Sequence, residues 1–156
     1  MITIFYRYVL PENFHLGNLT ENDAEQLREE RAYGVPENNL RFYRYTAQHY
    51  PSVAVIDRST SKPVSYIAYR PEGCLGVGYT TPPHRRKGFF KVVCFELLKK
   101  LRALGDSSTY ALTSAGGASM KAMQAVGGFI YPNYTAAAME CIPENMSTAR
   151  NSSRNA

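Results

Sequence analysis

The sequence predicts an α+β fold in which helices pack on a mostly antiparallel sheet. Three β-rich runs follow one another in the middle of the chain, at Ser52–Asp57, Pro63–Arg70 and Cys74–Thr80. The first two are separated by the polar stretch Arg58–Lys62, which predicts a hairpin. Stretches with helical periodicity stand before and after these runs. With 156 residues, the chain is long enough for one compact domain with its own core.

The N-terminal part predicts two short strands followed by a helix. Residues 1–10 alternate weakly in polarity, which favours an opening strand, and Phe14–Thr20 predicts another. Thr20 is followed three residues later by Asp23, a spacing that resembles a capping box. We therefore expect a helix from this point to about Tyr33.

Two further helices flank the central strands. Pro36 suits the first turn of a helix over Glu37–His49. After the third β-rich run, the apolar spacing predicts a long helix to about Leu104, with Gly105 at its end. The residues expected on its buried face are Phe90, Val93, Cys94, Leu97, Leu101 and Leu104.

The C-terminal part predicts a strand, a helix and two last strands. Thr109–Thr113 resembles a buried strand, and Ser119 can cap a helix that Gly127 and Gly128 end. The last two strands are expected at Phe129–Tyr131 and Tyr134–Cys141. Residues 143–156 are polar with little to bury, so we expect a disordered tail there and one domain over residues 1–142.

The net charge of +5 admits nucleic acid, an anionic surface or a polyphosphate ligand as partner. The basic residues gather at His84–Lys91 and again at Lys99, Lys100 and Arg102. They show no repeated interleaving with aromatic residues and no recognisable nucleic-acid module, so we expect no nucleic-acid partner.

Hydropathy and cysteine content suggest a soluble cytoplasmic protein, although a mitochondrial location stays open. No apolar run approaches the ~20 residues of a membrane span, and the N-terminus lacks the pattern of a signal peptide. We expect no membrane partner. The three cysteines, Cys74, Cys94 and Cys141, are expected to be reduced core residues. Their spacing to the histidines fits no metal site, so we expect no metal.

The segment Thr80–Phe90 joins a predicted strand to a predicted helix through a basic loop with one glycine. Backbone amides at a helix start lack intrahelical acceptors, so they favour an anion there. Gly88 lets the backbone approach such a ligand, and Arg85, Arg86 and Lys87 add positive charge. This pattern predicts a site for a pyrophosphate-bearing cofactor. The alternative is a solvated basic loop that caps a core helix.

Four stretches at matching spacing resemble the GNAT acyltransferase superfamily, and within it the C-terminal domain of glycine N-acyltransferase-like proteins. LPENFHLGNLTENDAEQL resembles the opening strand and helix, and NNLRFYRYTAQHYPSVAVID the second helix and next strand. GYTTPPHRRKGF resembles the T-x-P-E-x-R-x-x-G segment, and MKAMQAVGGF the end of the second helix near the cofactor. The resemblance extends from about Leu10 to Pro143.

The resemblance implies a GNAT-like sheet whose fourth and fifth strands splay apart around acyl-CoA, the co-substrate. The pantetheine arm would pair with the backbone near Val77–Thr80, and the amides of Arg86–Phe90 would hold the pyrophosphate. The implied cofactor-binding residues are Val77, Gly78, Tyr79, Thr80, Arg85, Arg86, Lys87, Gly88, Phe89 and Phe90. Phe90 departs from the superfamily loop R-x-x-G-x-G/A, which has a small residue there, although glycine N-acyltransferase-like sequences tolerate a larger one.

Catalysis is where this sequence departs most from the family. The family glutamate thought to act as general base aligns with Pro83, which cannot accept a proton. His84 is the neighbouring titratable group and our candidate base. A bound water relayed to Glu72, or capture of the free amine, are other routes. Gln124 stands nearest to the tyrosine that some GNAT enzymes use to protonate the thiolate, but a thiolate can leave without a strong acid.

The predicted function is acyl transfer from acyl-CoA to the amino group of glycine or another small amine. Two alternatives stay open: a CoA-binding domain that has lost turnover, and an acetyltransferase that acts on a protein or peptide. The resemblance implies acyl-CoA and the amine as partners, in a monomer or weak dimer. Glycine N-acyltransferases carry an additional N-terminal domain, so we expect either a single-domain relative or a fragment.

Overall fold

The structure is a computed structural model that describes residues 6–30, 36–106, 109–128 and 130. The described part contains a five-stranded sheet in the order β1-β2-β3-β4-β5. The strands are β1 (Phe14–Gly17), β2 (Ser52–Asp57), β3 (Lys62–Tyr69), β4 (Cys74–Thr80) and β5 (Tyr110–Ala111). Neighbours from β1 to β4 pair antiparallel, and β5 pairs parallel with β4. The predicted mixed, mostly antiparallel sheet is therefore confirmed.

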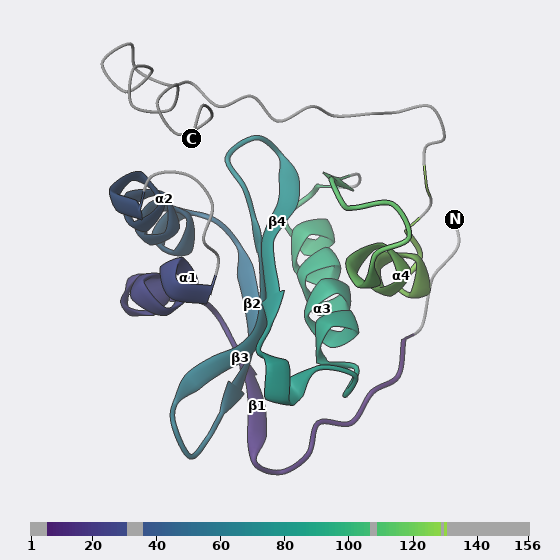
Figure 1. The fold of residues 1–156 in the computed structure, drawn as a ribbon. Coiled ribbons are helices and arrows are strands. Elements are labelled where there is room, and N and C mark those ends of the chain that lie inside the picture. The colour runs from purple at the N-terminus through teal and green to yellow at the C-terminus, as the bar shows by residue number, and fades with distance from the viewer. Residues whose placement is uncertain (1–5, 31–35, 107–108, 129, 131–156) are drawn as a thin grey trace, which may run out of the picture.

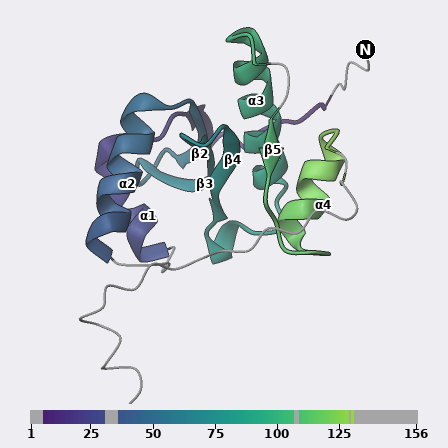
Figure 2. The same cartoon turned by 90° about the horizontal axis from the view of Figure 1, so that it is seen from above.

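Helices cover both faces of this sheet (Figure 1). They are α1 (Ala24–Glu30), α2 (Pro36–His49), α3 (Phe89–Ala103) and α4 (Ala118–Ala125). Figures 1 and 2 show α1 and α2 on one face, and α3 with α4 beside it on the other. The face that α3 covers is called the α3 face below, and the opposite one the α1/α2 face.

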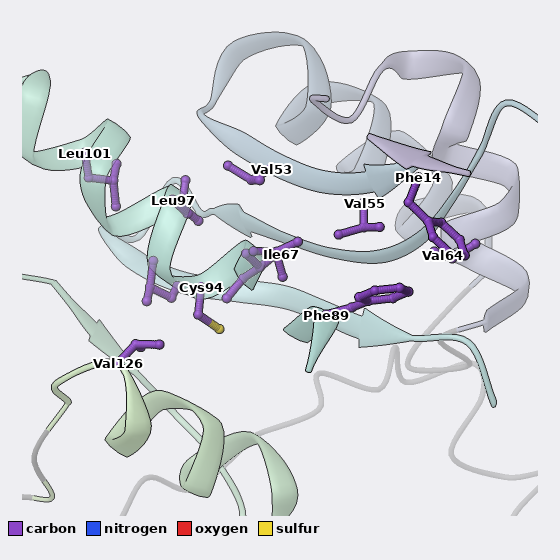
Figure 3. Packing of buried hydrophobic residues seen from close by; sticks show 12 residues of the cluster. Phe14, Val53, Val55, Val64, Ile67, Phe89, Cys94, Leu97, Leu101 and Val126 are labelled. Carbon is purple, nitrogen blue, oxygen red and sulfur yellow. The ribbon is translucent and has the colours of Figure 1, made fainter. Parts of the chain in front are cut away.

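The larger core lies between α3 and the sheet (Figure 3). Val93, Cys94 and Leu97 are completely buried against strand residues that include Val55 and Ile67. Burying side chains of this size contributes about 1.5–3 kcal/mol each. The predicted buried face of α3 is thus mostly correct. Leu104, however, is 68% exposed, because α3 ends at Ala103 and Leu104 lies beyond its last turn.

A second core lies on the α1/α2 face. Leu27 of α1 and Tyr43 of α2 pack there against strand residues that include Ala54, Tyr66 and Ala68. The start of α1 is fixed as predicted, because the Asp23 carboxylate accepts hydrogen bonds from Thr20 N–H (2.7 Å) and Thr20 Oγ1 (2.8 Å). A single 3-10 turn, Glu21–Asp23, precedes the helix.

The expected opening strand is wrong for its described part, because residues 6–10 have no strand structure. Instead, Tyr6 packs edge-on against Phe95 of α3, and the Tyr8 hydroxyl donates to Glu96 Oε1 (2.9 Å). Burial, together with this hydrogen bond, raises the pKa of Tyr8 to about 12. The alternation was too weak to distinguish a strand from an extended segment whose tyrosines bind a helix.

Other boundaries differ by a few residues. The strand expected at Thr109–Thr113 is limited to Tyr110–Ala111. Ser119 does not cap α4: Gly117 is the N-cap, and Ser119 is an exposed residue of the first turn. The two expected last strands and the expected tail lie outside the described residues, apart from Ile130, which has no strand structure.

Candidate functional site

The loop between β4 and α3 ends in a backbone turn that exposes a helix start. Gly88 caps α3 with a φ of 80°, a conformation that favours glycine. The first helical bond runs from Val92 N–H to Gly88 O (3.2 Å), so the amides of Phe89, Phe90 and Lys91 precede it. Arg86 also has a positive φ of 62°. Such a turn at a helix start is suited to bind an anion.

The three cations of this loop are positioned differently. Arg85 folds back along β4: its Nε donates to Thr80 O (3.0 Å), and its guanidinium lies 5.6 Å from the centre of the Tyr79 ring. All three cations are exposed, Arg85 included. In the described part of the chain, no ion pair joins them to a carboxylate. All three therefore add positive charge that faces solvent beside the helix start.

In the described part of the chain, β5 pairs with β4 only at Cys74 and Leu75, while β4 continues to Thr80. The edge of β4 beyond Leu75 is called the open edge of β4 below. Thr81 N–H donates to Val64 O of β3 (2.9 Å), so the backbone groups of Thr80, one residue earlier, point away from β3. This is the splayed arrangement expected for the fourth and fifth strands (Figure 2).

A bulge distorts β4 beside this open edge. Two β4 residues, Val77 and Gly78, stand opposite Ile67 alone, and Val77 has a φ of 53°. A β-branched residue rarely adopts this conformation, which costs about 1–2 kcal/mol. Strained backbone of this kind is typical of functional sites, because it directs backbone groups where a regular ladder would not.

Phe90 packs on Gly78 across the α3 face of the sheet. A Cβ at Gly78 would lie 2.9 Å from two atoms of the Phe90 ring. The ring fills space next to the helix start, at the position where Phe90 departs from the loop pattern R-x-x-G-x-G/A. Gly78 and Phe90 are therefore a matched pair in this chain.

His84 is held by packing interactions. Its Nδ1 lies 2.7 Å from Thr81 Oγ1, and its ring contacts Phe14 edge-on at 5.6 Å and stacks with Phe89 at 6.3 Å. Phe14 belongs to β1, at the opposite edge of the sheet from β5. These contacts give His84 a structural role, and its role as a base stays a prediction.

The other residues considered for catalysis lie apart from one another. Pro83 is exposed in the 3-10 turn Pro82–His84. Glu72 lies in the turn between β3 and β4, where its carboxylate binds Arg70 Nη2 (2.6 Å). Gln124 is an exposed residue of α4.

The α1/α2 face carries polar groups that no sequence motif indicates. The Tyr66 hydroxyl donates to Glu30 Oε2 (2.6 Å), and the Tyr66 ring lies 6.0 Å from that of Tyr79. The guanidinium of Arg70 lies 5.5 Å from the centre of the Phe42 ring of α2. The only signal for this cluster was the alternation within Pro63–Arg70, which assigns Tyr66 and Arg70 to the same face.

Two open hollows of about 520 Å³ each lie elsewhere, and both border Glu96 and Lys99 of α3. None of the residues from Val77 to Phe90 lines them. An extended ligand at a strand edge needs a groove and not an enclosed pocket, so the open edge of β4 remains the better candidate. Within the described ranges, no group of His, Cys, Asp and Glu could hold a metal, and no helix is long and apolar enough to cross a membrane.

No protein-family profile matches the sequence. Solved structures do resemble it. A Drosophila protein is 15% identical with a TM-score of 0.65, over 77% of this chain and 40% of its own. The enzyme AAC(6')-Iy, in complex with the bisubstrate analogue CoA-S-monomethyl-acetylneamine, is 14% identical with a TM-score of 0.63, over 82% and 99%. A predicted acetyltransferase with acetyl-CoA from Clostridium acetobutylicum is 9% identical with a TM-score of 0.62, over 80% and 96%.

The chain has the GNAT fold. At these identities the likeness concerns the fold alone, so the GNAT resemblance is confirmed at that level. The closer similarity to glycine N-acyltransferase-like proteins stays a prediction. Within this fold, the open edge of β4 and the start of α3 are joined by the loop of residues 81–88, and we treat them as one candidate site.

Proposed function

We propose that the protein is an acyl-CoA-dependent N-acyltransferase that acts on glycine or another small amine. One observation carries the proposal: the open edge of β4 is joined by a single loop, residues 81–88, to the Gly88-capped start of α3. A ligand with an extended amide-containing arm and a diphosphate can use both features at once. The solved structures of this fold that hold acetyl-CoA or a CoA-based analogue support the choice of ligand.

Each part of the site has a separate role in this proposal. The amides of Phe89 and Phe90 bind the diphosphate, and the exposed cations Arg86 and Lys87 add charge. The backbone of Val77–Thr80 pairs with the pantetheine arm. Acyl-CoA is a co-substrate and supplies the activated acyl group as a thioester.

The reaction is direct aminolysis of that thioester. The neutral amine attacks the carbonyl carbon, the N–C bond forms, and the C–S bond breaks with departure of CoA thiolate. Thiols have a pKa near ~8.5, so the thiolate leaves without a dedicated acid. A backbone N–H at the open edge of β4 stabilises the oxyanion. The proton of the amine passes to water or to a base, for which His84 remains our candidate.

The primary test is release of free thiol from a panel of acyl-CoA donors with glycine, other small amines and peptides as acceptors. We expect release above the uncatalysed rate with at least one small amine. Binding of acetyl-CoA is measured separately by calorimetry, with Arg85→Ala together with Arg86→Ala as the weakened variant. Absence of both thiol release and binding would refute the proposal, and a preference for peptides would select the protein acetyltransferase alternative.

The role of His84 has its own test. If His84 is the base, His84→Gln should lower kcat by about 10²- to 10⁴-fold. If His84 only packs between Phe14 and Phe89, the variant should unfold at lower temperature while kcat of the folded protein stays the same.

A second function, CoA binding without turnover, is favoured by one observation. Pro83 occupies the aligned position of the family base, and His84 is engaged with Thr81 and two aromatic rings. This alternative predicts acetyl-CoA binding with no thiol release. Pro83→Glu should then produce thiol release, and a variant that binds acetyl-CoA and remains inactive would count against this alternative.

A further inference from the structure

The side chain of Arg70 crosses β4 at the point where β4 and β5 separate. Arg70 follows β3, and its backbone N–H donates to Cys74 O (2.8 Å). Its aliphatic part lies over Gly76, where a Cβ would overlap Arg70 Cδ. Gly76 is the first residue of β4 beyond the pairing with β5, which ends at Leu75. Because residue 76 is glycine, the Arg70 side chain can lie across β4 at the position where the open edge begins.

The hydrogen bonding of this guanidinium is incomplete. Nη2 is bound by Glu72 Oε1 (2.6 Å), and the guanidinium carbon lies over the Phe42 ring, 5.5 Å from its centre. Nε is buried, and no residue of the described part accepts a hydrogen bond from it. A guanidinium presents its N–H groups as a rigid fork that matches the two oxygens of a carboxylate. A buried N–H without a partner is costly, so a ligand carboxylate would be a favourable partner here.

Arg70 lies close to where the acceptor would meet the thioester, an inference that rests on the proposed function. Thr80 and Gly76 are four residues apart along β4, or about 13 Å at ~3.3 Å per residue. A cofactor arm that pairs along Val77–Thr80 therefore brings its thioester close to Gly76. Core side chains lie on both faces of this part of β4: Phe90 on the α3 face, and Val77 with Tyr43 on the α1/α2 face. Arg70 lies over Phe42 on the α1/α2 side, so an acceptor bound by Arg70 reaches the thioester from that side.

We propose that Arg70 binds a carboxylate of the acceptor, which makes amino acids and other carboxylate-bearing amines the acceptor class. Arg70 positions the acceptor and takes no part in bond making. A purely structural arginine would instead hold the turn between β3 and β4 through Glu72. That ion pair is partly exposed, with 36% and 51% of the two side chains accessible, so it contributes little to stability.

The test compares glycine with glycinamide, which has the same amine but no carboxylate. We expect Arg70→Gln to raise KM for glycine about 10- to 100-fold with little change in kcat. KM for glycinamide should stay within about twofold of the wild-type value. Arg44→Gln is the matched control, because Arg44 also forms an exposed ion pair on the α1/α2 side, with Glu25 (3.5 Å). Equal losses with both acceptors in Arg70→Gln would overturn the proposal.

A binding measurement separates this inference from the proposed function. The Arg70 Nε–H resonance is assigned in ¹⁵N NMR spectra by its absence from Arg70→Lys, which keeps the charge and the fold. We expect glycine, added with CoA, to shift this resonance, and glycinamide to leave it unchanged. A shift without any acyl transfer would refute the enzyme and keep the carboxylate site. A resonance that glycine does not move would overturn the inference, whether or not the protein transfers acyl groups.

Discussion

Replacing Arg86 with glycine should raise the stability of the fold and lower its affinity for acyl-CoA. Arg86 combines two properties in the loop before α3: its side chain is exposed, and its backbone has a φ of 62°. The first property provides charge for a diphosphate. The second is unfavourable for residues other than glycine, with asparagine and aspartate the partial exceptions.

The magnitude follows from these two properties. A non-glycine residue in the left-handed region costs about 1–2 kcal/mol. Replacing Arg86 with glycine removes this cost but makes the unfolded chain more flexible, which offsets about 0.5–1 kcal/mol of the gain. The net gain is about 0.5–1 kcal/mol, which raises Tm by about 1–4 °C for a chain of this size. Loss of one exposed charge should weaken CoA binding about two- to fivefold at low salt, and less at high salt.

Thermal unfolding followed by circular dichroism measures the first effect, and calorimetric titration with CoA at two salt concentrations measures the second. Two controls separate charge from backbone. Arg86→Gln removes the charge and keeps the strain, so it should weaken CoA binding without raising Tm. Ser61→Gly relieves a similar φ of 56° in the turn between β2 and β3, so it should raise Tm and leave CoA binding unchanged.

A lower Tm for Arg86→Gly would show that the turn does not carry this strain. Unchanged CoA affinity at low salt in both Arg86 variants would show that this cation does not face the diphosphate. In that case the basic loop would only be a solvated cap of α3.

Three further predictions concern the strands and helix that form the site. Ser65 is buried, and its hydroxyl lies 2.7 Å from Thr80 Oγ1. Thr80→Val should therefore lower the free energy of unfolding by about 1–3 kcal/mol in denaturant unfolding, and adding Ser65→Ala should recover most of this loss. No recovery in the double variant would contradict the coupling of the two hydroxyls. Gly78→Ala should cost about 1–3 kcal/mol by overlap with the Phe90 ring, and an equal cost in a Phe90→Ala background would exclude that cause. Burial raises the pKa of the Cys94 thiol to about 12. The stability that this neutral thiol contributes is therefore fully present below the thiol pKa of the unfolded chain, near ~8.5, and is lost as pH rises toward 12. Cys94→Ala should flatten this decline of the unfolding free energy with pH, measured by urea unfolding, and an unchanged pH dependence would refute the prediction.

The local features of this protein follow from short stretches of its sequence. The strands β2 and β4 and the helix α2 begin and end within a residue of the predicted positions, because alternation, helical spacing and proline act over a few neighbouring residues. The Thr20–Asp23 cap and the Gly88 turn were predictable for the same reason. The candidate diphosphate site belongs to this class, since a helix start with a glycine and cations is continuous in sequence.

Contacts between residues that are distant in sequence depend on the three-dimensional fold. Tyr8 binds Glu96 of α3 instead of extending the sheet, and His84 lies between the rings of Phe14 and Phe89. Arg70 lies across Gly76, a contact that depends on how β3 turns into β4 and on how α2 covers them. Local periodicity assigns a residue to a face of its own element but does not specify which element packs against that face, because packing depends on shape and burial across the whole chain.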